Sequence, residues 1–135
     1  MYGCGTYGLE LSNVEQLTAI NCDIYDCSYG AIQAWGCWNL QFINCTFRDM
    51  ECLSAIDLLS SHHVTFEDSS FSAINTGHSS NPEYPAPFLE LRYNTDLTFL
   101  RTEFTNNVAD VLMSSWTAGT TFTDCTFTGN SFSAP

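Results

Sequence analysis

The nine residues Asn39-Leu40-Gln41-Phe42-Ile43-Asn44-Cys45-Thr46-Phe47 decide the fold, because their pattern of apolar and small polar residues recurs along the chain. The recurrences are residues 16–24, 63–71, 96–104 and 119–127, and the leading apolar residues of the five blocks are 23, 24, 33 and 23 positions apart. A shorter apolar block precedes each one by eight positions, beginning at Leu9, Ile32, Ile56, Leu89 and Leu112. Two blocks that keep a common register five times indicate a tandem repeat.

The period of 23–24 residues predicts a solenoid of about five stacked coils. Leucine-rich repeats share this period, but they need a Leu/Asn consensus and a helical segment on the convex side. Here short alternating runs are separated by Ser, Asn, Asp and Gly, and no stretch keeps an apolar rhythm of 3.6 residues. We therefore expect an all-β fold with three short strands in each coil.

Parallel pairing between coils, at a strand spacing of about 4.8 Å, would place equivalent side chains on top of one another. The predicted core consists of two such columns: Phe42, Phe66, Phe99 and Phe122 in the first, and Ile24, Phe47, Phe71, Phe104 and Phe127 in the second. These columns contain eight of the ten Phe residues of a chain of 135 residues, which explains its aromatic content.

The residues that follow each repeated strand carry a family resemblance. A turn position holds Asn21, Asn44, Asp68 and Asp124, and the small residue after the turn is Cys22, Cys45, Ser69, Thr102 or Cys125. With this pattern the chain resembles the right-handed parallel β-helix family, the pectate-lyase-like superfamily of polysaccharide-acting enzymes, tail-spikes and adhesins. The resemblance covers residues 7–130, with Arg101 as the one departure at the turn. It implies the fold and leaves the activity open.

We expect a single domain over residues 1–135 that is a fragment of a longer chain. The longest spacing places one loop insertion at residues 76–87. Neither end offers an amphipathic helix to cover the terminal coil, which predicts end-to-end self-association or a covering partner. The chain has no targeting segment and no run of eighteen apolar residues, and the resemblance implies an extracellular or cell-surface location.

The net charge of −12, with three Arg and no Lys, argues against nucleic acid, anionic membranes and strongly acidic polymers as partners. It is compatible with neutral glycans, Ca²⁺ or a basic protein, and surface acids also keep a stacked β protein soluble. Seven Cys without a CxxC motif make a zinc ribbon a poor interpretation. We expect mostly thiols, with Cys22 and Cys45 in one inward column and Cys4–Cys27 as the favoured bridge if one forms.

The first candidate site is catalytic and consists of Asp57, Glu90 and Arg92. The outward residues of the leading strands are Glu10, Gln33, Asp57, Glu90 and Met113. Asp57 and Glu90 are consecutive members, so their separation would approach the ~5 Å that retaining glycosidases use. Alternatively, they are the polar half of an alternating strand, and Arg92 neutralises them. Pectate lyases need several Asp for Ca²⁺ beside a catalytic Arg. The trio is too small a set for that, so no cofactor is expected and Ca²⁺ stays only a compatible ion.

The second candidate is a ligand-binding surface made by aromatic and polar side chains. In the insertion, Tyr84 could stack on a sugar ring, with His78 nearby in the same loop. Trp35 and Trp38 flank a turn, where exposed aromatic residues commonly contact glycans or proteins. Trp116 adds to this possibility.

Three further patterns are weaker. The triplet Asn94-Thr95-Asp96 looks like an element of polygalacturonases, but the other elements of that family are missing. His63 is expected beside Asp96 in the next coil, and two ligands do not make a metal site. The outward column Thr18, Gln41, Thr65, Thr98 and Thr121 resembles the Thr arrays of ice-binding solenoids, although Thr is an ordinary exposed strand residue.

The sequence therefore favours a non-catalytic β-helical scaffold or binding segment that contacts carbohydrate or a protein partner. A glycoside hydrolase or lyase that uses Asp57, Glu90 and Arg92 is the first alternative. A self-assembling or ice-binding solenoid is the second.

Overall fold

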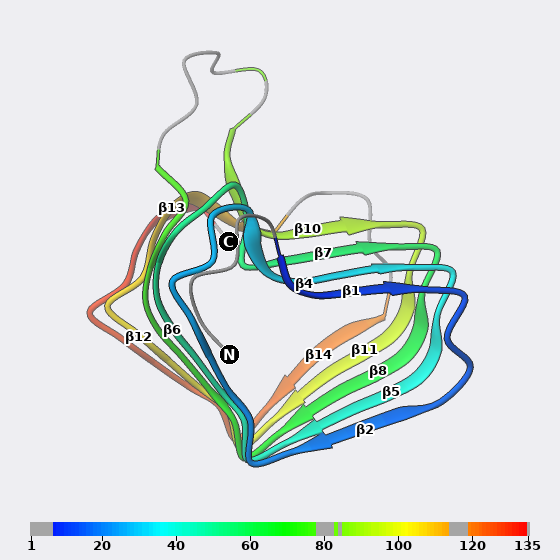
Figure 1. Cartoon of the computed structure of the whole chain (residues 1–135). Coiled ribbons are helices and arrows are strands. Elements are labelled where there is room, and N and C mark those ends of the chain that lie inside the picture. Colours follow the sequence, from blue (N-terminus) through cyan, green and yellow to red (C-terminus); the bar gives the residue numbers. More distant parts are fainter. Residues whose placement is uncertain (1–6, 78–82, 84, 114–118, 135) are drawn as a thin grey trace.

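The computed structural model describes residues 7–77, 83, 85–113 and 119–134, which form strands and turns without a helix. The chain winds into a parallel β-solenoid of about five turns with a period of about 24 residues, as the repeat predicts. Figure 1 shows the coils lying directly on one another around a common interior. Nothing in the described part of the chain forms a helix that is long and apolar enough to cross a membrane.

Each full coil contributes one strand to each of three sides. The first side contains β1 (Tyr7–Ser12), β4 (Gly30–Trp35), β7 (Ile56–Leu59), β10 (Pro87–Arg92), β13 (Val108–Met113) and β16 (Ser131–Ala134). The second contains β2 (Leu17–Ile20), β5 (Trp38–Ile43), β8 (His62–Glu67), β11 (Thr95–Leu100) and β14 (Thr120–Thr123). The third contains β3 (Asp23–Tyr25), β6 (Thr46–Glu51), β9 (Ser70–Asn75), β12 (Glu103–Thr105) and β15 (Thr126–Thr128). The second side is a separate five-stranded sheet, whereas the first and third join through β13 and β9.

The register places like side chains in columns, as the sequence predicts. Phe66 pairs with Phe42 on one side and Phe99 on the other, and Phe99 pairs with Phe122. The second column runs through Ile24, Phe47, Phe71, Phe104 and Phe127. Stacked rings within the columns have centroids 4.7–5.2 Å apart. Rings from the two columns meet edge to face, for example Phe66 and Phe71 at 5.5 Å, which favours the ring quadrupoles.

Left-handed residues sit at equivalent positions near the bends of the coil. Four columns have positive φ: Asn13, Gly36, Ser60 and Tyr93; Asn39, His63, Asp96 and Gly119; Asn21, Asn44, Asp68, Arg101 and Asp124; and Asp26, Asp49, Ala73, Asn106 and Gly129. Asn, Asp, His and Gly tolerate this conformation best, which explains most of the residues present. Tyr93, Arg101 and Ala73 hold it because the coils above and below fix the bend.

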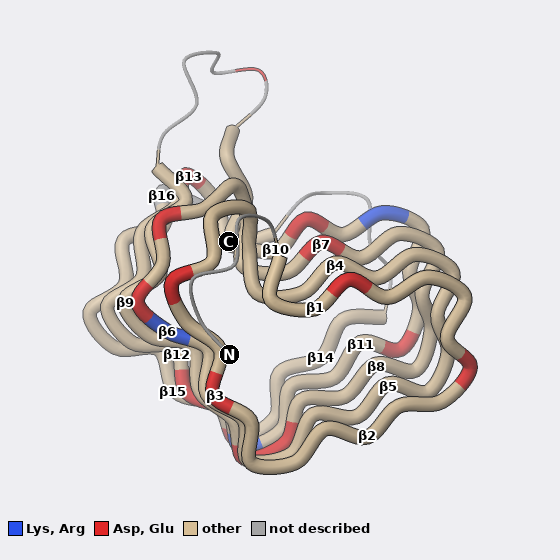
Figure 2. Tube along the Cα trace, viewed as in Figure 1, with Lys and Arg blue, Asp and Glu red and all other residues tan. Residues whose placement is uncertain are grey.

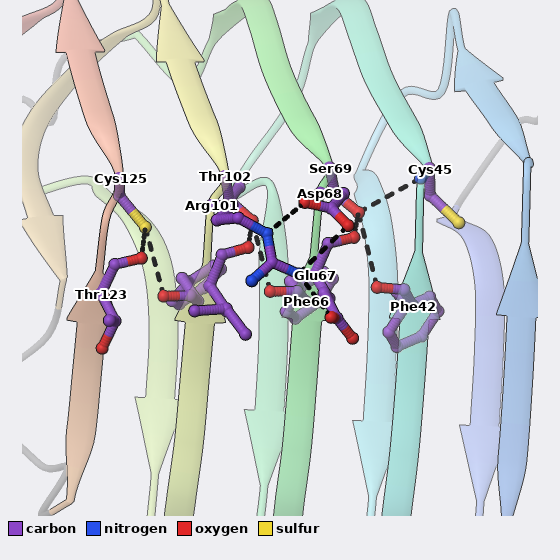
Figure 3. Close-up of polar contacts among 12 residues, drawn as sticks. Phe42, Cys45, Phe66, Glu67, Asp68, Ser69, Arg101, Thr102, Thr123 and Cys125 are labelled. Atoms are coloured by element: carbon purple, nitrogen blue, oxygen red, sulfur yellow. Dashed lines mark hydrogen bonds and ion pairs between the residues drawn. The ribbon is translucent and has the colours of Figure 1, made fainter.

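A column of small polar side chains closes the bend between the second and third sides (Figure 3). The Oγ of Ser69 lies 3.1 Å from the Glu67 carbonyl and 3.4 Å from the Phe42 carbonyl of the preceding coil, and it accepts the Cys45 amide hydrogen. The thiols of Cys45 and Cys125 and the hydroxyl of Thr102 repeat this arrangement with their own pairs of carbonyls. The predicted small-residue column is therefore a hydrogen-bonding element.

The insertion leaves the coil between β9 and β10, within the predicted residues 76–87. Its two stems are both bonded to β13: the Thr76 amide donates to the Val108 carbonyl, and the Ala86 carbonyl accepts from Asp110 and Val111. Two donors on one carbonyl indicate a local irregularity in β13. Beside these stems the register also changes: Met113 pairs with Leu89, not with Glu90 as the uniform repeat predicts.

The cysteines are mainly thiols, as expected. Cys45 and Cys37 are buried and Cys52 is half-buried, whereas Cys22 is exposed. Cys22 shares the column of Cys45, as the repeat predicts, because each thiol contacts the carbonyl two residues before it; Cys22 is exposed at the first end of the described coils. Cys4 lies outside the described residues, so the Cys4–Cys27 bridge stays a prediction.

Candidate functional site

The predicted catalytic trio is assembled on the outer face of the first side. Glu90 of β10 pairs directly with Asp57 of β7, as the repeat spacing requires. Arg92 lies opposite Leu59, and its side chain turns back toward both acids. Its Nη2 is 3.2 Å from Asp57 Oδ1, and its Nε is 3.8 Å from Glu90 Oε1. Figure 2 shows acidic positions of β1, β7 and β10 along this face, with the arginine at the end of β10.

Burial controls the electrostatics of this trio. The Asp57 side chain is 12% exposed, and Arg92 compensates its charge. Desolvation raises the pKa of Glu90, Arg92 opposes this shift, and Asp57 adds to it. Desolvation, followed by the charge of Asp57, raises the pKa of the nearby Tyr7 to about 12. The arrangement therefore favours the neutral form of Glu90 relative to a free carboxyl, while Asp57 is engaged by the guanidinium.

The second candidate surface lies on the outer face of the second side, at the start of β5 and β8. The Trp38 ring packs against the His62 ring with centroids 4.4 Å apart and lies 5.9 Å from the His63 ring. The Nδ1 atom of His62 is 2.6 Å from the Thr95 hydroxyl of the next coil, which holds this ring in place. Trp38 is thereby fixed on one side and remains 47% exposed.

The left-handed column explains why so many side chains point outward here. Asn39, His63 and Asp96 have φ values of 57°, 58° and 54°. Strand residues normally alternate between the two faces, but a left-handed residue interrupts this alternation. Both Trp38 and Asn39 are therefore exposed, one after the other.

These side chains border a polar groove of about 340 Å³, lined by Gln16, Asn39, Gln41, His63 and Thr65. Its lining includes amides, a hydroxyl and an imidazole, which can each donate or accept hydrogen bonds. On its rim, Nδ1 of His63 lies 2.9 Å from Asp96 Oδ2. We refer to this lining together with Trp38 as the Trp38 groove.

The structure brings together only some of the predicted ligand-binding residues. Neither tryptophan lines the groove: Trp38 adjoins it through the ring of His63, 5.9 Å away, whereas Trp35, which is 48% exposed, ends β4 on the first side. His78, Tyr84 and Trp116 lie outside the described residues. The expected proximity of His63 and Asp96 is confirmed. The sequence analysis did not single out Asn39 and Gln41 as site residues. One repeat position is occupied by Asn39, His63, Asp96 and Gly119, and these residue types could have indicated a left-handed bend there.

Two further hollows follow the bend between the third and first sides. One of about 450 Å³ is lined by Asp26, Cys27, Ser28, Asp49, Met50, Glu51, Ala73 and Asn75. The other, of about 380 Å³, shares Ser28, Glu51 and Asn75 with it and includes Cys52, whose thiol pKa burial raises to about 12. Neither hollow and no part of the Trp38 groove is lined by the Asp57, Glu90 and Arg92 trio.

Metal binding has no support in the geometry of the described ranges. Across those ranges, no group of three or more His, Cys, Asp or Glu side chains is placed to hold a metal ion. Asp57 and Glu90, the acids that a Ca²⁺-dependent lyase would need, instead share Arg92. No step proposed below passes through a metal.

Comparison with protein families places the whole solenoid in a known repeat family. The family model described as "Right handed beta helix region" matches residues 1–134. No curated protein matches the chain.

Proposed function

The chain belongs to the right-handed β-helix family, and we propose that it is a non-catalytic scaffold that binds carbohydrate in the Trp38 groove. This fold carries many unrelated functions, so the proposal depends on the groove and not on the family. The observation that carries it is an exposed, laterally supported Trp ring beside a polar groove.

The composition of the groove suits a sugar. An indole offers a flat apolar face, which can cover the C–H face of a pyranose ring, while its rigid side chain loses little entropy on binding. Asn39, Gln41 and Thr65 both donate and accept, as sugar hydroxyls do. The ring of His62 packs against the ring of Trp38, and the contact of His62 with Thr95 holds His62 in place. The orientation of Trp38 is therefore fixed before a ligand binds.

The scaffold role is supported by the repetition of the same contacts in successive coils, so that no single contact holds a bend alone. Equivalent hydrogen bonds repeat from coil to coil, and the aromatic columns run through the interior without interruption at the insertion. A solenoid of this kind presents a rigid, extended surface.

Binding to a panel of soluble polysaccharides, measured by affinity electrophoresis and then by calorimetry, tests the proposal. Trp38→Ala should weaken binding by about thirtyfold, because truncation of an aromatic anchor costs about 2 kcal/mol. Trp35→Ala is the matched control, since the residue type is the same, the exposure is nearly equal, and Trp35 ends β4 on the first side, whereas Trp38 packs beside the lining residue His63. Equal losses in both variants would contradict the assignment to the groove, and no binding by the parent protein would overturn the proposal.

The alternative is a polysaccharide hydrolase or lyase that uses Asp57, Glu90 and Arg92. It is supported by the raised pKa of Glu90, which favours a carboxyl that keeps its proton. Release of reducing ends or of unsaturated products from the same polysaccharides measures this activity. Turnover that disappears in Asp57→Asn would establish the enzyme, whereas no turnover by the parent protein, or turnover that Asp57→Asn leaves unchanged, would exclude it.

A further inference from the structure

We infer that the Trp38 groove selects an uncharged glycan and that a sugar hydroxyl donates a hydrogen bond to Nε2 of His63, with Asp96 as the positioning residue. The inference rests on the proposed function and adds the ligand class and the specificity-determining contact. Its starting point is the 2.9 Å contact between His63 Nδ1 and Asp96 Oδ2.

The contact fixes the imidazole. A carboxylate accepts hydrogen bonds, so the contact with Asp96 selects the His63 tautomer that carries its proton on Nδ1, in which Nε2 is the acceptor. Nε2 has no hydrogen-bonding partner among the residues that the structure describes, and the ring lines the groove. An acceptor at this position is complementary to a hydroxyl, the most abundant donor of a neutral sugar.

The charges around the groove discriminate against acidic sugars. Asp96 lies on the rim, and Glu15 precedes the lining residue Gln16. The groove lining contains no arginine, and Arg101, which follows β11, is engaged by Glu67 and Asp68 at 2.6 Å each. A uronate would therefore meet like charges without a cationic partner, which disfavours its binding.

The tests use substitutions that the backbone already accepts at this position. Gly119 occupies the position equivalent to Asp96, and Asn39 the position equivalent to His63, so Asp96→Gly and His63→Asn remove the side-chain groups without adding left-handed strain. Asp96→Asn keeps an acceptor oxygen at nearly the same place and serves as the conservative variant. Thermal unfolding of each variant checks that the coil is intact.

The experiment compares a neutral polysaccharide that the parent protein binds with its uronate counterpart of the same linkage, by calorimetry. The neutral polymer should bind at least about tenfold more tightly, and Asp96→Gly and His63→Asn should each weaken it by about three- to tenfold, the value of one hydrogen bond. Nitrogen-15 NMR of His63 should show the Nδ1–H tautomer in the parent protein and its loss in Asp96→Gly, with recovery in Asp96→Asn.

The outcomes separate this inference from the proposed function. Binding that depends on Trp38 but is equal for the neutral and uronate polymers, or is unchanged in His63→Asn, overturns the inference alone. An unchanged tautomer in Asp96→Gly removes the role of Asp96. Absence of binding to every neutral glycan overturns both proposals.

Discussion

Phe66 and Phe99 lie face to face across the insertion, with ring centroids 5.0 Å apart and ring planes inclined by 11°. The same stacking geometry joins Phe42 to Phe66 and Phe99 to Phe122, where no insertion intervenes. The stacked core therefore continues across the insertion without a change in its geometry.

Truncation of this column should be costly. Phe66 is fully buried and contacts Phe42, Phe99 and the rings of the second column. We expect Phe66→Ala to lower the free energy of unfolding by about 3–5 kcal/mol, measured by urea denaturation. Phe127→Ala is the control: this ring is 44% exposed, and we expect a clearly smaller loss. Similar losses at both positions would contradict a continuous stacked core.

The polar column at the bend makes a second prediction. Ser69→Ala would leave the buried Cys45 amide without its acceptor, and we expect a loss of about 1–3 kcal/mol in the free energy of unfolding. Ser69→Cys should cost less, because Cys already occupies this column at Cys45 and Cys125 and bonds to the equivalent carbonyls. If the two variants are equally stable, the side-chain hydrogen bonds of the polar column do not contribute to the free energy of unfolding.

Ala73 is held in a left-handed conformation, with φ at 53°, where a Cβ atom is unfavourable. Gly129 occupies the same column two coils later. Ala73→Gly should therefore raise the free energy of unfolding by about 1 kcal/mol, measured by urea denaturation. The neighbouring strand position gives the opposite expectation: Ser72→Gly should lower it by about 0.5–1 kcal/mol, because Ser72 has no left-handed strain to relieve.

The free energy of unfolding should depend on pH through Glu90 of the trio. Because the folded state raises the pKa of Glu90, stability is greatest below the unfolded pKa of about 4.3 and is lost as the pH rises through the folded value. Glu90→Gln should therefore be more stable than the parent protein near neutral pH, with the difference disappearing toward pH 4. Thermal unfolding across this range measures it.

Asp68 provides a control, because its pKa shift has the opposite sign to that of Glu90. Hydrogen bonds from Arg101 lower its pKa, so its contribution is present above the unfolded pKa and is lost as the pH falls through the folded value. Asp68→Asn, at a position where Asn44 precedes it in the column, should be less stable near neutral pH and indistinguishable from the parent protein in acid. Parallel pH profiles for the two variants would contradict the assigned shifts.

The repeat in the sequence determined the fold and the contacts between equivalent positions, except at β13, where the register differs. Once parallel stacking is inferred, residues one period apart must be neighbours, so the Phe columns, the Asp57–Glu90 pair and the His63–Asp96 pair could all be predicted. The insertion could be placed for the same reason, because a spacing longer than the period has to leave the coil.

Only the tertiary structure decided what the side chains do outside that register. Arg92 turns back to Asp57, β13 shifts so that Met113 meets Leu89, and a left-handed Asn39 keeps its side chain on the outer face beside that of Trp38. These outcomes depend on φ values and rotamers that the adjacent coils impose at each bend, and an apolar pattern carries no information about them. The repeat therefore determined the solenoid, whereas the packing of coil on coil decided where its surface forms a groove.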